Sequence, residues 1–220
     1  MSQAPGFFQS SIGRKIVMAV TGAILVLFVL GHMTGNLLVY VGPEALNHYA
    51  VFLRQFLHGA ALWIVRAVLL ASVTLHIWSA ASLTRESRRA RPVGYREQKW
   101  KESTYASRTM RWGGVIILLF VIYHLLHFTF GTVHPSFVEG DVYHNFVTGF
   151  RSVPASLAYI VAMIALGLHL RHGVWSMFQT VGVSHPRYIR MAHVAAWVVA
   201  ILIVVGNISF PLTILAGIVK

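Results

Sequence analysis

The amino-acid sequence predicts an all-α membrane protein with five transmembrane helices. Hydrophobic residues make up 56% of the chain and charged residues only 11%, whereas a soluble domain carries about 25% charged residues. Five apolar runs contain no Asp or Glu, and each reaches the roughly 20 residues that a helix needs to cross a bilayer. The net charge of +12 would indicate a nucleic-acid partner only if the basic residues lined a water-facing surface. Here they lie between the apolar runs, which favours a membrane protein, and the low charged fraction excludes an ordinary soluble enzyme.

The runs are expected to be helical because a bilayer offers backbone groups no hydrogen-bond partner outside their own segment. The first run is too long for the apolar region of a signal peptide, and no small-residue cleavage site follows it. We therefore interpret it as a span, and residues 1–220 as a single membrane domain. The predicted helices lie at approximately 16–41, 60–84, 108–133 (with its apolar run from 112), 153–180 and 191–217.

The connections between the runs carry an asymmetric charge. The first and third connections, loops 42–59 and 134–152, lie on the same side of the membrane and hold only Arg54 and Arg151 as cations. Because positive charge collects on the cytoplasmic side, the N-terminus is expected in the cytoplasm and the C-terminus outside. We expect a multi-pass protein of a bacterial cytoplasmic membrane. The cations on the other side are Arg14, Lys15, Arg187, Arg190 and those of the loop from Arg85 to Arg111, namely Arg85, Arg88, Arg89, Arg91, Arg96, Lys99, Lys101, Arg108 and Arg111.

Histidine is the unusual residue of this chain, with 12 copies, while Cys is absent. Four histidines fall at two depths. His32 and His124 each lie sixteen residues from the cytoplasmic start of their helix, about 24 Å at a rise of about 1.5 Å per residue. His76 and His169 lie eight and ten residues before the cytoplasmic ends of theirs, about 12 and 15 Å deep. The depths pair His32 with His124 in the outer half and His76 with His169 in the inner half.

Two pairs of histidines from four helices predict a bundle that binds two b-type haems, since two neutral imidazoles can ligate one iron and bundle cores build cofactor sites from facing helices. A covalently attached c-type haem would need Cys. Zinc is less favoured because it prefers a tetrahedral set of close ligands. Small residues near the histidines would admit a porphyrin plane, although ordinary helix packing explains each one equally well. They are Gly31 and Gly35, Ser72 and Ala80, and Ala165 and Gly173.

Two assignments stay open on spacing alone. His127 and His172 lie three residues after His124 and His169, on roughly the same helix face. The small neighbours favour His169 over His172, but His124 and His127 are not separated. The spare histidines are alternatives for binding a haem propionate or a quinone. The other six are expected in loops or at membrane edges: His48, His58, His134, His144, His185 and His193.

At these residues the sequence resembles the di-haem cytochrome b membrane anchor of succinate:menaquinone oxidoreductases and quinol:fumarate reductases, in the class with a single large five-helix anchor. The resemblance covers almost the whole chain. It is carried by Gly31-His32-Met33, Leu75-His76, Tyr123-His124 and the stretch His169-Leu170-Arg171-His172-Gly173-Val174-Trp175 followed by Gly182.

The resemblance implies His32 with His124, and His76 with His169, as axial haem ligands. It implies electron transfer from an iron–sulfur subunit through two b haems to menaquinone. A flavoprotein with FAD and the iron–sulfur protein would bind at the cytoplasmic face, where the loop from Arg85 to Arg111 is a candidate docking surface. Succinate would be oxidised in the flavoprotein. In one fumarate reductase of the family a Glu two residues before the fourth ligand takes part in proton transfer, and Gly167 stands there in this chain.

Further site residues are candidates only. Haem propionates need cationic or hydrogen-bonding partners, and an Arg inside an apolar run demands one. The candidates for this role are Arg66, Arg14, Lys15, Arg108, Arg111 and Arg171. For the quinone, Glu44 and His48 are the candidates, since Glu44 is the acid nearest His32 in sequence. The alternative for Glu44 is an N-terminal acid of a short interfacial helix over 44–57.

Two other functions share some of these features. A di-haem anchor of formate dehydrogenase or hydrogenase would bind its haems in the same way but would have a different partner subunit. A haem-free transporter could use intramembrane histidines to carry protons, although the paired depths and the lack of an intramembrane acid disfavour it.

Overall fold

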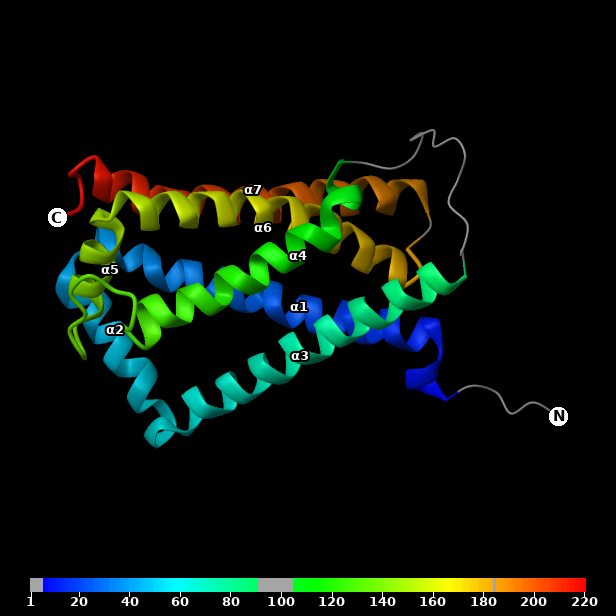
Figure 1. The fold of residues 1–220 in the computed structure, drawn as a ribbon, viewed down its shortest axis with the longest axis horizontal. Coiled ribbons are helices and arrows are strands. Elements are labelled where there is room, and N and C mark those ends of the chain that lie inside the picture. The colour runs from blue at the N-terminus through cyan, green and yellow to red at the C-terminus, as the bar shows by residue number, and fades with distance from the viewer. Residues whose placement is uncertain (1–5, 91–104, 184) are drawn as a thin grey trace.

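In the computed structural model, which describes residues 6–90, 105–183 and 185–220, long helices form a bundle that is covered at one end by shorter ones (Figure 1). Five helical spans in these ranges are long and apolar enough to cross a membrane. The predicted all-α fold with five transmembrane helices is therefore confirmed. The long helices are α1 (Ser11–Asn36), α3 (Ala60–Arg89), α4 (Tyr105–His124), α6 (Val153–Thr180) and α7 (Pro186–Leu215).

Several helix ends differ from the predicted ones because capping, and not hydropathy, sets them. The α1 helix begins five residues early, where the Ser10 hydroxyl accepts a hydrogen bond from the Gly13 N–H at 2.9 Å. The α7 helix also begins five residues early, with His185 as its N-cap and Pro186 in its first turn, a position that suits proline. The α6 helix has the predicted bounds.

The α4 helix ends earlier than predicted and changes its winding. It runs to His124 and continues as one π turn, Leu125–Thr129, and Gly131 then leaves the helix with a φ of 71°. A π turn is wider than an α turn and occurs often at functional sites. Here it begins directly after one of the predicted ligands.

The long helices are arranged so that α1 packs against α3 and α6, and α4 packs against α6. Around the bundle the order is α3, α1, α6, α4, which makes α1 and α4 diagonal partners, and likewise α3 and α6. The α7 helix packs along the outside of α6, where small side chains such as Ala196 and Ala200 are buried. The fifth helix thus supports the bundle and brings no predicted ligand.

Two short helices, α2 (Pro43–Gln55) and α5 (Val142–Arg151), close the end of the bundle that we call the capped end (Figure 1). The α5 helix was not predicted, because its apolar positions lie within a polar loop. It buries Phe146, Val147 and Phe150 in a core cluster with Leu46 of α2 and Phe210 of α7. The opposite end of the bundle, where α1 and α7 begin, is called the N-terminal end below.

Asp141 joins the two short helices. Its carboxylate accepts hydrogen bonds from the His144 N–H at 2.9 Å and from the Asn47 side-chain amide at 3.0 Å, while Oδ1 of Asn47 accepts one from the Tyr143 N–H. These two donors lower the pKa of Asp141 below its ordinary value. The carboxylate therefore stabilises the capped end above the pKa of an unfolded Asp, and this contribution is lost as the pH falls through the lower folded pKa.

Asp141 is the N-cap of α5. Asp141→Ala is therefore expected to destabilise the protein by about 1 kcal/mol at neutral pH, the usual cost of losing an N-cap. Thermal unfolding in detergent should show this difference at pH 7. The difference should shrink as the pH falls below the pKa of an unfolded Asp, about 4, and should disappear below the lower folded pKa, where the wild-type carboxylate is protonated. Asp141→Asn keeps an acceptor oxygen and serves as the control. A difference of constant size across this range would contradict the assignment.

Candidate cofactor-binding site

The four predicted histidines meet in two pairs inside the bundle. The rings of His32 on α1 and His124 on α4 have their centroids 5.8 Å apart, with an interplanar angle of 86°. The rings of His76 on α3 and His169 on α6 are 6.3 Å apart at 58°. Each pair therefore joins diagonal helices across the bundle. The first pair, nearer the capped end, is called the outer pair, and the second the inner pair.

The structure separates His124 from His127. His124 faces His32, whereas His127, in the π turn, is 1% exposed and stacks on Tyr123 at 5.4 Å. The Tyr159 hydroxyl of α6 lies 3.2 Å from Nδ1 of His124 and 3.1 Å from Nδ1 of His127. His124 is thus the α4 histidine available to the pair.

On the other side of the outer pair, His32 stacks on Phe28, with ring centroids 5.5 Å apart at 15°. Its Nε2 lies 3.3 Å from the Asn36 amide nitrogen one turn along the helix. This contact is long for a hydrogen bond, and it holds a ring nitrogen that a metal would otherwise take. The Asn36 side chain can release it without moving the backbone.

The inner pair is held differently. Nδ1 of His76 lies 3.2 Å from the Met18 carbonyl oxygen and 3.2 Å from the Thr21 hydroxyl. Its Cε1 would lie 3.3 Å from a Cβ at Gly22, so the glycine lets the ring approach α1. Backbone carbonyls commonly orient histidines in this way and leave Nε2 free to ligate a metal.

His169 has a ring nitrogen in need of a partner. Its Nδ1 is buried and has no hydrogen-bond partner among the described residues, which is costly for a polar atom in an apolar interior. A cluster of three or more metal-ligating side chains is likewise not found in the described part of the chain. Each pair therefore offers two nitrogens, fewer than zinc requires and as many as the axial positions of one haem.

The separations of the rings suit a bis-imidazole haem. A metal–imidazole bond is about 2 Å long, so two such bonds in line place the ring centroids about 6 Å apart. The observed values are 5.8 and 6.3 Å. The residues present thus fit two haems, one per pair.

The small residues near the histidines divide into two groups. No atom of the described residues lies within 4 Å of a Cβ built at Gly31 or at Gly173, so both positions border open space. A Cβ at Gly35 would lie 2.5 Å from Tyr49 Cε1. Gly35 is therefore required for the contact between α1 and α2. For this glycine, ordinary helix packing explains the small residue.

The candidate propionate partners have other contacts in this structure. Arg14 at the N-terminal end pairs with Glu86 and so links α1 to α3. The Arg66 guanidinium lies 4.9 Å from the Trp63 ring centroid, and that of Arg171 lies 4.2 Å from the ring of Trp197 on α7. Lys15 and Arg111 are exposed, and Arg108 lies in the first turn of α4. None of these contacts tests propionate binding, which stays a prediction.

The candidate quinone residues lie at the capped end. Glu44 is exposed in the first turn of α2, after the N-cap Gly42, and His48 is exposed one turn later. The short interfacial helix weighed as the alternative is therefore present. The structure holds no further observation that joins the two residues to a quinone.

Of the histidines not yet placed, His172 lies within α6 and His193 within α7, and the others lie in loops or near helix ends. At the capped end, His134 contacts the Asn145 carbonyl of α5 and His144 contacts the Ser136 carbonyl. His185 caps α7, and His193 stacks on Trp175 at 3.7 Å. His58 lies in the corner before α3, where it and Leu57 have positive φ angles.

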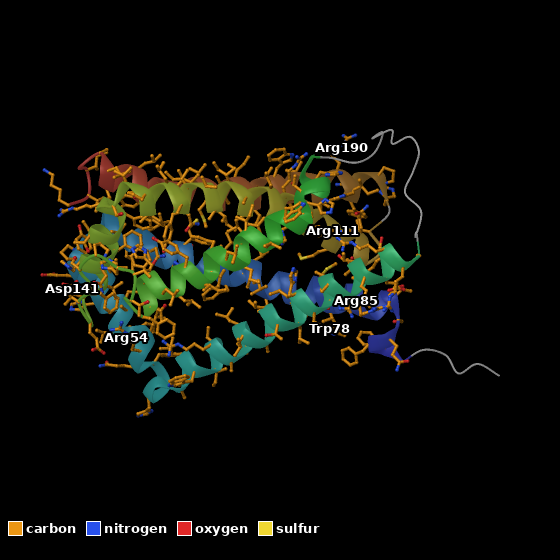
Figure 2. The ribbon with its side chains drawn as sticks, viewed as in Figure 1. Arg54, Trp78, Arg85, Arg111, Asp141 and Arg190 are labelled. Atoms are coloured by element: carbon orange, nitrogen blue, oxygen red, sulfur yellow. The ribbon has the colours of Figure 1, made fainter. Side chains whose placement is uncertain are left out.

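Figure 2 shows Arg85, Arg111 and Arg190 at the N-terminal end of the bundle, with Arg54 and Asp141 toward the capped end. The charge asymmetry seen in the sequence thus separates the two ends of the fold. The middle of the predicted docking loop, with Arg91, Arg96, Lys99 and Lys101, lies outside the described residues.

A family model described as the succinate dehydrogenase/fumarate reductase transmembrane subunit matches residues 87–208, more than half of the chain. The chain belongs to this family. The match spans α4 and α6, and so includes one histidine of each pair, His124 and His169. No curated protein and no solved structure matches the chain.

Membership makes the chain the membrane subunit of an enzyme complex of the succinate dehydrogenase and fumarate reductase type. It favours this assembly over the formate dehydrogenase and hydrogenase anchors. Sequence reasoning did not find Tyr159, Met18 or Thr21, which contact the histidines of this anchor. The sequence does not indicate which residue a single Tyr or Thr in an apolar helix will contact, and it does not indicate which backbone carbonyl will accept a side-chain hydrogen bond.

Proposed function

We propose that this membrane anchor holds two b haems and connects the iron–sulfur subunit of its complex to menaquinone. The observation that carries the proposal is the presence of two diagonal histidine pairs, 5.8 and 6.3 Å apart between ring centroids. Each of four helices contributes one histidine, as in other bundles with a buried cofactor. A haem b in each pair would supply one-electron redox chemistry within the membrane.

The side chains of the anchor would bind and orient the two groups. His32 and His124 would ligate the outer haem, and His76 and His169 the inner one. Thr21 and the Met18 carbonyl would hold the His76 ring in one orientation. Arg66, Arg14, Lys15, Arg108 and Arg171 remain candidates for the propionates.

We further propose that the N-terminal end faces the cytoplasm, because that end holds most of the Lys and Arg and cytoplasmic ends are positive. The iron–sulfur subunit would dock there, together with the flavoprotein that carries FAD, and Arg85 and Arg111 are described residues of this surface. Menaquinone would react near the capped end, where Glu44 and His48 are candidates. Transfer of one charge across the whole membrane is worth about 2.3 kcal/mol per 100 mV, so turnover would depend on the membrane potential.

The test is a reduced-minus-oxidised spectrum of the purified complex, with a haem count per anchor by pyridine haemochrome. We expect two b haems per chain, and reduction of both by succinate. A count of one would show that a pair is misassigned. A complex without haem would overturn the proposal and favour the histidine-lined transporter.

A substitution at Gly173 tests whether the open space beside His169 receives the porphyrin. Gly173 lies four residues after His169, on the same helix face, and a Cβ built there has no described atom within 4 Å. Gly173→Leu is expected to leave the fold intact and lower the haem count from two to one. Val161→Leu, at a position of α6 that is 60% exposed, is the control, and two haems in Gly173→Leu would contradict the placement.

A further inference from the structure

The Tyr159 hydroxyl lies between the two histidines of α4. Its oxygen is 3.2 Å from Nδ1 of His124 and 3.1 Å from Nδ1 of His127. The Tyr159 side chain is 6% exposed, and edge-to-face contacts fix its ring against Phe120 and Phe150, both at 4.9 Å. The hydroxyl is therefore held in place by the packing of α4, α5 and α6.

A donor count gives these hydrogen bonds a direction. A phenol has one proton to donate, and a neutral imidazole has one N–H and one acceptor nitrogen. If His124 ligates a metal through Nε2, its proton must reside on Nδ1, and Nδ1–H then donates to the Tyr159 oxygen. The Tyr159 hydroxyl in turn donates to Nδ1 of His127. The His127 proton then lies on Nε2, the buried nitrogen that has no partner among the described residues.

We propose that Tyr159 is a positioning residue that fixes the ring orientation and the tautomer of His124, and that His127 anchors Tyr159 by accepting a hydrogen bond from its hydroxyl. The inference rests on the proposed function, because it concerns a ligand of the outer haem. It assigns the spare histidine of α4 a role other than ligation. It also makes the two pairs unequal, since His76 is held by α1 and His169 has an Nδ1 without a partner.

The hydrogen bond should change the electronic properties of the ligand and not only its position. An acceptor on the far N–H raises the basicity of a ligating imidazole, which favours the ferric state of the iron. Removing the Tyr159 hydroxyl should therefore favour the ferrous state. Loss of a partner of this kind typically changes metal affinity or activity about 10- to 100-fold. A tenfold change in the equilibrium between ferric and ferrous iron corresponds to about 59 mV for a one-electron couple.

The experiment compares Tyr159→Phe with Tyr40→Phe in the purified complex. Tyr40→Phe removes a hydroxyl that donates to Ser209 at 2.7 Å and touches no predicted haem ligand, so it controls for the loss of a hydroxyl. The readouts are haem content, the potential of each haem by redox titration, and the low-field signal of each low-spin ferric haem in electron paramagnetic resonance. The signal lost in His32→Ala identifies the outer haem.

We expect Tyr159→Phe to raise the potential of the outer haem by about 59 mV or more, the value of a tenfold change, and to shift its resonance signal. The inner haem should be unchanged, as should both haems in Tyr40→Phe. Loss of the outer haem alone would support the same role. Wild-type potentials and signals in Tyr159→Phe would overturn this inference while two haems per chain keep the proposed function.

A second pair of variants tests the anchor. His127→Leu removes the acceptor of the Tyr159 hydrogen bond and should reproduce the shift in potential expected for Tyr159→Phe. His127→Asn keeps an acceptor near the Nδ1 position and should return the potential toward the wild-type value. Equal potentials in the two His127 variants would contradict the role of His127 as a hydrogen-bond acceptor. A wild-type complex without haem would overturn the proposed function, and this inference with it.

Discussion

His124→Ala is expected to remove one of two haems and to leave the other in place. His124 is the α4 histidine that faces His32, with ring centroids 5.8 Å apart, while the inner pair uses different helices. The pyridine haemochrome count should therefore fall from two haems per chain to one. The remaining haem should keep its wild-type spectrum, because His76 and His169 have no part in the lost site.

His127→Ala is the matched control, since it removes a histidine three residues away on the same helix. That side chain contacts Tyr159 and His134 and does not face His32. We expect two haems in this variant, with the outer one altered in its spectrum. If His127→Ala loses a haem and His124→Ala retains both, the outer ligand has been assigned to the wrong residue.

Gly167→Glu is expected to disrupt the packing of α6 against α7. Gly167 is buried, and any Cβ at this position would overlap Cγ2 of Val204 on α7. Val204 is β-branched and cannot swing aside easily. Overpacking costs about 1–3 kcal/mol, and a buried carboxylate without a partner adds about 3 kcal/mol or more. We expect a loss of at least about 3 kcal/mol in unfolding free energy, measured by thermal or detergent-induced unfolding.

A double-mutant cycle isolates the steric part of this effect. Gly167→Ala should destabilise the protein by itself, and Val204→Ala in the same chain should recover part of the loss because it removes the overlapping methyl group. Additive effects of the two substitutions would refute the contact. Position 167 thus faces α7.

The number and approximate extent of the membrane helices could be predicted from the sequence, because a bilayer imposes a minimum length of apolar helix. The histidine pairs could be expected from depth alone, since helical rise converts sequence distance into position along the bundle. Short stretches such as His169 to Trp175 also indicated the family, and the family match supports this assignment.

Periodicity could not separate His124 from His127, because two residues three apart share a helix face. The structure made that distinction, because His124 faces His32 while His127 lies in the π turn Leu125–Thr129. The α5 helix escaped prediction because Phe146 and Phe150 gain their partners only when α2 and α7 are in place. Gly35 and Gly173 look alike in sequence, yet one packs against Tyr49 and the other borders open space.

The sequence by itself determined the membrane class, the five spans and the two depths at which histidines lie, because these depend on composition and on distance along one helix. The tertiary structure alone decided which helices are diagonal, which histidine of α4 faces its partner, and which hydroxyls and carbonyls hold the rings. Those features depend on side chains from segments far apart in the chain. A hydrogen bond between α4 and α6 leaves no pattern in the order of residues until the two helices are packed together.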